Sequence, residues 1–313
     1  MTDISLKKHF MYASNLYRLL CQFPENDLFY NQHIPILEHP ADALRKALNN
    51  SYNALKKLSD VDKENYDDCK ECVKNVFNEV DSFYDITFEI FKTFYSPTGR
   101  TKNKNNKDWL KENGINIVKK YTSNVDAFSS FVSDINNLTK HNTWNFMPFK
   151  LSYNNNSEIY SFYFGTNLQD DTIGPNQNIH KKWKGFQTGF SYNFIIRKLI
   201  AQIFLYQEKL YTCLKSDFTI FKMKDKDVND EGINKKLFEL AFNIPLHFLP
   251  NEFELQSGKF TKQNDNYLIQ FPKNYVNEAP KVQNISVNFN LQNNPRTNMI
   301  KGVLPYFQNV KPQ

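Results

Sequence analysis

Two neighbouring apolar stripes within residues 69–95 constrain the fold more than any other feature of this sequence. The first repeats at alternating steps of four and three residues, and the second runs beside it at helical spacing. The first consists of Cys69, Val73, Val76, Val80, Phe83, Thr87, Ile90 and Phe94, and the second of Phe77, Tyr84, Phe88, Phe91 and Tyr95. An α-helix with two such stripes must be covered on both. We therefore predict a helix at the centre of a bundle.

Further helices are predicted on both sides of this segment. Apolar residues recur every three to four positions in residues 4–23, and Pro40 is typical of a first helical position. Asp60 is a candidate N-cap for the central helix. A short helix around residue 109 should end at Gly114, and the capping-box-like spacing of Ser123 and Asp126 predicts where the next helix begins.

After residue 141 the apolar period changes from that of a helix to that of a strand. Phe149, Leu151 and Tyr153 alternate with polar residues, and the strand-like segment 159–164 follows a run of Asn and Ser at residues 154–157. Residues 190–214 form a long helical segment that is apolar nearly all round, so it should be packed on most sides. The final hundred residues suggest strands at 218–223, 267–271 and 285–291 and a helix near 234–242.

The predicted fold class is therefore α+β. A helical bundle over residues 1–145 is followed by an α+β region over 146–313, with a hairpin at 147–164, a long buried helix at 188–215 and a small mixed C-terminal sheet. The change of period makes a domain boundary near residue 145 plausible. The alternative is that the 188–215 helix packs back on the first bundle and makes one unit.

Composition and charge limit the class of protein. With 40% hydrophobic and 15% aromatic residues the chain has ample material for a core. No apolar run approaches the roughly 20 residues that a bilayer requires, and residues after Lys8 lack the continuous apolar core of a signal peptide. We expect a cytoplasmic protein without a membrane span. Residues 96–224 hold 18 Lys and Arg against 9 Asp and Glu, an asymmetry that suits either a polyanion or an ordinary solvated surface.

The familiar cofactor motifs are missing from the sequence. Cys69 and Cys72 have C-x-x-C spacing, but no second such pair completes a zinc site, so we expect them to pack in the core. The chain has 9 Gly and lacks the glycine-rich phosphate-binding loops. We therefore predict no metal and no cofactor.

One polar constellation points to chemistry. In residues 134–142, Asn137, Lys140 and His141 follow one another at helical spacing, opposite an apolar face. This element resembles the R-N-x-x-K-H element of HEPN-type helical bundles, which are found in bacterial defence and toxin systems. The resemblance covers residues 1–145, and the position aligned with the family's Arg is Asn136.

The resemblance implies a helical bundle, a homodimer and a metal-independent attack on RNA. In active HEPN members an Arg and a His meet across the dimer, where the cation holds the scissile phosphate and the His helps proton transfer from a 2′-hydroxyl. Asn136 cannot supply the charge, so the resemblance implies compromised catalysis. Lys140 is the alternative cation, although a Lys at a helix end also fits the helix dipole.

A second cluster of candidate residues lies later in the basic segment. Lys181, Lys182 and Lys184 flank Trp183, a composition that can contact phosphates and stack on a base. An ordinary polar loop anchored by one Trp has the same composition.

Three functions remain open from the sequence. The first is an intracellular defence or stress protein that contacts RNA or binds a partner with compromised catalysis. The second is an active metal-independent endoribonuclease using His141 with Lys140. The third is a structural interaction protein without nucleic-acid contact.

Overall fold

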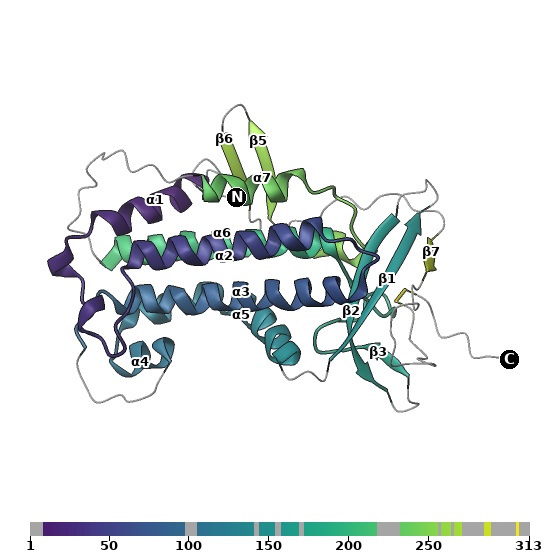
Figure 1. Ribbon diagram of the computed structural model, residues 1–313, viewed down its shortest axis with the longest axis horizontal. Helices are drawn as coiled ribbons and strands as arrows, with labels where there is room; N and C mark the ends of the chain where they lie inside the picture. The colour runs from purple at the N-terminus through teal and green to yellow at the C-terminus, as the bar shows by residue number, and fades with distance from the viewer. Residues whose placement is uncertain are drawn as a thin grey trace.

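The structure is a computed structural model in which an elongated helical bundle carries a β-sheet at one end (Figure 1). It describes residues 9–97, 105–140, 144–153, 158–168, 172–217, 232–255, 258–263, 266–270, 285–288 and 305–306. The α-helices are α1 (His9–Gln22), α2 (Pro40–Asp60), α3 (Tyr66–Lys92), α4 (Asn106–Glu112), α5 (Asn116–Lys140), α6 (Tyr192–Asp217) and α7 (Ile233–Asn243). The strands are β1 (Asn145–Tyr153), β2 (Glu158–Asn167), β3 (Ile173–Pro175), β4 (Phe190–Ser191), β5 (Lys259–Gln263), β6 (Asn266–Gln270) and β7 (Ile285–Asn288).

The central position of α3 is confirmed. Every residue of its first apolar stripe is buried, and in the second stripe only Tyr95 is partly exposed. The helix packs against α2 and α5 most extensively and also contacts α4 and α6. A helix covered on two sides is what the double stripe requires.

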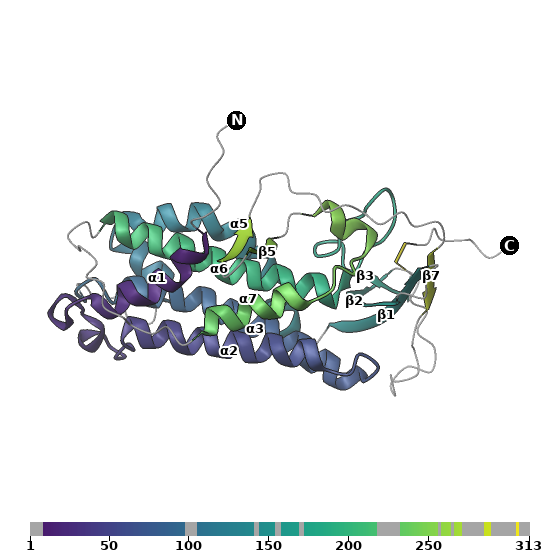
Figure 2. The same cartoon turned by 90° about the horizontal axis from the view of Figure 1, so that it is seen from above.

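The long helix α6 packs on the N-terminal helices rather than beside them as a separate layer. It contacts α1 and α5 extensively, and α2 and α3 as well. Its buried residues belong to the same hydrophobic cluster as those of α1, α2, α3 and α5. In Figures 1 and 2 it runs along the bundle towards the sheet. The α+β class, with a helical N-terminal region, a hairpin and a long buried helix, is therefore confirmed.

The N-cap of α3 differs from the prediction. Asp60 is the last residue of α2, because Lys63 Nζ donates to the carbonyl oxygens of Leu58, Ser59 and Val61 and closes that helix. Asn65 caps α3 instead, and its side-chain oxygen accepts the backbone N–H of Asp68 at 3.2 Å. Pro40 does begin α2, as predicted.

The start of α5 also differs from the prediction. The helix begins at Asn116, and Ser123 lies inside it, where its Oγ donates to the carbonyl of Lys120 at 2.9 Å. Serine forms local hydrogen bonds to the backbone both at an N-cap and inside a helix, so the residue type alone does not distinguish the two positions. Ile117 and Tyr121 are buried, so the apolar face extends one turn back towards Gly114. Gly114 follows α4 with a positive φ of 72°, which confirms the predicted stop.

The sheet has the order β3-β2-β1-β7, with β4 also paired to β2, and the described pairs are all antiparallel. The predicted hairpin corresponds to β1 and β2, in which Phe149 opposes Ser161 and Leu151 opposes Ile159. Both faces are covered: Phe146, Phe162 and Phe164 join the main core, and the opposite face makes a second cluster. The turn at residues 154–157 lies outside the described residues.

The C-terminal region follows the prediction in outline. The expected helix is α7, the expected strands at 267–271 and 285–291 correspond to β6 and β7, and the expected strand at 218–223 lies outside the described residues. Strand β5 was not expected; it pairs with β6 in an antiparallel hairpin. The described strand pairs of this region are antiparallel, so they form no mixed sheet. The connection between β5 and β6 is too short for the crossover that parallel pairing needs.

Candidate functional site

The last turns of α5 hold the residues that carry the HEPN resemblance. Asn136 is buried, and its Nδ2 donates to Oδ2 of Asp81 on α3 at 2.6 Å. Ser133 donates through Oγ to Oδ1 of the same carboxylate, also at 2.6 Å. These bonds tie α5 to α3. The position aligned with the family's Arg therefore holds an amide that faces a carboxylate.

The remaining residues of this element lie at the surface or outside the described residues. Asn137 and Lys140 are exposed, and His141 lies outside the described residues. The pKa of the Asp85 carboxyl is raised, mainly by burial and also by the neighbouring Asp81, while the Lys140 ammonium opposes this shift. The Asp85 carboxyl thus partly offsets the positive charge that Lys140 would offer to a phosphate.

Two of the four side chains at residues 181–184 contact Glu254. Lys181 and Lys182 are exposed, whereas Trp183 Nε1 donates to Oε2 of Glu254 at 2.7 Å. Lys184 Nζ lies 3.4 Å from Oε1 of Glu254 and 4.3 Å from the centroid of the Trp183 ring. Glu254 therefore neutralises one of the three lysines, and that lysine covers the indole on which a base would stack.

A buried carboxyl lies near the start of α6 and has no signal in the sequence. Glu252, in the 3-10 helix η4 (Pro250–Glu254), accepts the backbone N–H groups of Ser191 and Leu249 and the Ser191 hydroxyl, at 2.6–2.7 Å. Ser191 Oγ also accepts the N–H of Phe194 and so caps α6. Burial raises the pKa of Glu252 to about 8, against the opposing effects of these bonds and of the Lys198 ammonium. No spacing in the sequence connects residues 61 positions apart.

His180 is a second buried titratable group near the sheet. Its Nε2 accepts the backbone N–H of Phe164 at 2.9 Å, and its ring centroid lies 4.5 Å from that of Phe190. Burial lowers the pKa of His180 to about 3, so the ring is neutral at physiological pH. An enclosed neutral imidazole that holds a backbone N–H is a structural group.

The two cysteines of the C-x-x-C pair pack in the core, as expected. Cys69 and Cys72 are both buried on α3, and the Cys69 thiol donates to the carbonyl of Asp62 at 3.3 Å. Burial raises the pKa of both thiols, which disfavours the thiolate needed for redox or metal chemistry. Within the described ranges, no group of three or more His, Cys, Asp or Glu side chains is arranged to hold a metal ion.

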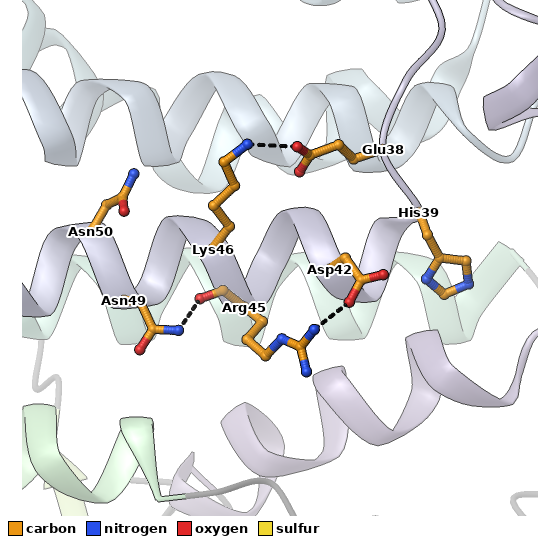
Figure 3. Close-up of a pocket in the computed structure, with 7 residues that line it drawn as sticks. All are labelled: Glu38, His39, Asp42, Arg45, Lys46, Asn49 and Asn50. Atoms are coloured by element: carbon orange, nitrogen blue, oxygen red, sulfur yellow. Dashed lines mark hydrogen bonds and ion pairs between the residues drawn. The ribbon is translucent and has the colours of Figure 1, made fainter.

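A concave, polar surface lies along α2. Figure 3 shows its lining residues, with Lys46 directed towards Glu38 on one side of the helix and Arg45 towards Asp42 on the other. The two ion pairs span 2.5 and 2.7 Å. A neighbouring groove shares Glu38, Lys46 and Asn50 with it and runs between α2 and α3. Its lining residues are Ile36, Glu38, Ala43, Lys46, Ala47, Asn50, Glu79, Ser82, Phe83, Ile86 and Glu89. We call this surface the α2–α3 groove.

The loop before α2 presents two large apolar side chains, and one of them, Ile36, lines the α2–α3 groove. Ile34 is 95% exposed and Ile36 is 73% exposed. The backbone around them is held in place, because His33 is buried with Nε2 3.0 Å from the carbonyl of Tyr95, and the N–H of Leu37 donates to the carbonyl of Tyr30. The exposed isoleucines therefore belong to a braced loop. Nothing in the sequence marks the side chains of this loop as exposed.

Comparisons with known proteins add no assignment. A scan against protein-family models, a search of curated proteins and a search of solved structures all found no significant match. Among the described residues, no helix is both long enough and apolar enough to cross a membrane.

Proposed function

We propose that this protein is a partner-binding module of HEPN-like type with compromised catalysis. In this proposal it acts in the cytoplasm in bacterial defence or stress, a context drawn from the sequence resemblance, and its partner is another protein. The braced loop with exposed Ile34 and Ile36 carries the proposal. Isolated exposed apolar residues are common, but two on one anchored loop beside a part-apolar groove are typical of a protein interface.

The surroundings of the candidate catalytic residues favour partner binding over RNA cleavage. Asn136 is engaged by Asp81, and Asp85 lies within electrostatic reach of Lys140. A nuclease of this type needs an uncompensated cation at the phosphate. RNA contact through Lys181 and Lys182 remains a second candidate, because both are exposed and neither forms an ion pair with another described residue.

Site-specific crosslinking tests the proposal. A photo-crosslinking amino acid in place of Ile34 should give a discrete covalent adduct with one protein in the native host, because this side chain is exposed at the proposed interface. The same amino acid in place of Glu71, which is exposed on α3 outside the groove, is the matched control. The adduct should weaken when Ile36→Asp is added. Equal adducts from both positions, or an adduct that Ile36→Asp leaves unchanged, would refute the proposed interface.

Restoring the family's cation tests the catalytic alternative. In Asn136→Arg the guanidinium is expected to pair with Asp81, so the variant should remain inactive on a broad RNA panel in the presence of EDTA. Gel analysis of the products measures this, with the thermal midpoint as the check on folding. Cleavage that appears in Asn136→Arg and disappears when His141→Ala is added would instead establish the endoribonuclease alternative.

A further inference from the structure

The length of the α2–α3 groove suits one short helix. Its wall on α2 runs from Ala43 to Asn50, and its wall on α3 runs from Glu79 to Glu89. At about 1.5 Å per residue these walls extend roughly 10 to 15 Å, the length of two to three helical turns. An amphipathic helix recognises such a groove by placing its apolar face between the walls.

The charge of the groove selects the chemistry of its occupant. Three carboxylates line it, those of Glu38, Glu79 and Glu89, and Lys46 is the single cation lining it in the described part of the chain. The Lys46 ammonium already pairs with Glu38 at 2.5 Å. With three carboxylates and one ammonium, the lining residues carry two negative charges in excess around an apolar floor that includes Phe83 and Ile86, and Lys92 lies within electrostatic reach of Glu89. A partner that buries this surface must bring positive charge or leave carboxylates unpaired.

We propose that the α2–α3 groove binds a basic amphipathic helix of a partner protein, with the exposed Ile34 and Ile36 packing against its apolar face. This inference rests on the proposed partner-binding function and adds the chemistry of the partner. Lys or Arg side chains of that helix face Glu79 and Glu89. A second copy of this chain fits less well, because in a symmetric dimer the same acidic groove would meet itself.

Three labelled peptides of about 14 residues test this inference. They share one pattern of Leu positions and carry Lys, Glu or Gln on the polar face. Fluorescence anisotropy with the full chain should show the Lys peptide binding at least about tenfold more tightly than the Glu peptide, with a preference that declines as salt rises. Glu79→Lys should weaken the Lys peptide about tenfold. Glu71→Lys, the same charge change outside the groove, should leave its affinity unchanged.

The variants separate failure of this inference from failure of the proposed function. Ile34→Ser with Ile36→Ser should weaken the Lys and Gln peptides alike, because it removes apolar contact and no charge. Equal binding of all three peptides, or equal effects of Glu79→Lys and Glu71→Lys, overturns the basic-helix inference. If crosslinking from position 34 succeeds while no peptide binds, the function stands and the helical occupant is wrong. A dimer in sedimentation that Glu79→Lys alters, without peptide binding, identifies a second copy as the occupant and also overturns the inference.

Discussion

Val80→Asp is expected to unfold or aggregate the protein. Val80 lies in the first apolar stripe of α3 with no exposed surface, among residues of the main core. A carboxylate there has no partner and no water, and its burial costs several kcal/mol. Because domains of this size have total stabilities of only about 5–15 kcal/mol, this one change removes a large part of the folding free energy.

Thermal unfolding followed by circular dichroism measures the Val80→Asp effect. Ser82→Asp is the matched control, since Ser82 is exposed on the same helix and receives the same charge. The control should shift the thermal midpoint only slightly, because exposed substitutions usually change stability by less than about 0.5 kcal/mol. A soluble Val80→Asp protein with the wild-type midpoint would contradict the central position of α3.

The helical part of the fold could be predicted because its signals are local. The double stripe of α3 and Pro40 at the start of α2 each depend on neighbouring residues, and the structure confirms both. The errors arose where a local pattern had two explanations. Ser123 looks like a cap, yet its hydroxyl bonds inside α5, and the cap of α3 is Asn65 because Lys63 closes α2 first.

The candidate site was less predictable because its contacts join distant parts of the chain. Helical spacing selected Lys140 and the family resemblance selected Asn136, but the partner of Asn136 is Asp81, 55 positions away. The Trp183 indole was proposed to stack on a base, and its engagement by Glu254 depends on a contact 71 positions away. Ile34 and Ile36 appear in the sequence as ordinary apolar residues, since exposure is a property of the folded chain.

The stability of the protein is expected to fall as pH rises from about 6 to 8, through Glu252. Its folded-state pKa, raised to about 8, lies above that of an unfolded glutamate near 4.3. The unfolded chain therefore releases this proton first. A group with a raised folded-state pKa stabilises fully below the unfolded value, and its contribution is lost as pH rises through the folded value. The slope reaches at most about 1.4 kcal/mol per pH unit.

Two other titratable groups near this cluster act mainly at the two ends of that pH window. His180, with its pKa lowered to about 3, destabilises the fold only as pH falls below the unfolded value near 6.5. Burial lowers the pKa of Lys198 to about 8, and Glu252 opposes this shift. The unfolded lysine keeps its proton up to about pH 10.4, so Lys198 raises stability with pH only above about 8. Around pH 7 the Glu252 contribution should therefore dominate this cluster.

Glu252→Gln should flatten the pH dependence and lower stability at pH 6. The amide cannot titrate, and its NH2 group would face the Leu249 N–H or the Ser191 donors that a carboxyl oxygen now accepts. Unsatisfied buried donors cost about 1–3 kcal/mol, so the urea-unfolding free energies of variant and wild type should converge as pH rises. Glu254→Gln, the same change at an exposed neighbour, should retain the wild-type slope. A Glu252→Gln protein with that slope intact would place the titrating group elsewhere, and the carboxyl would then be ionised throughout, held by its three donors and by Lys198.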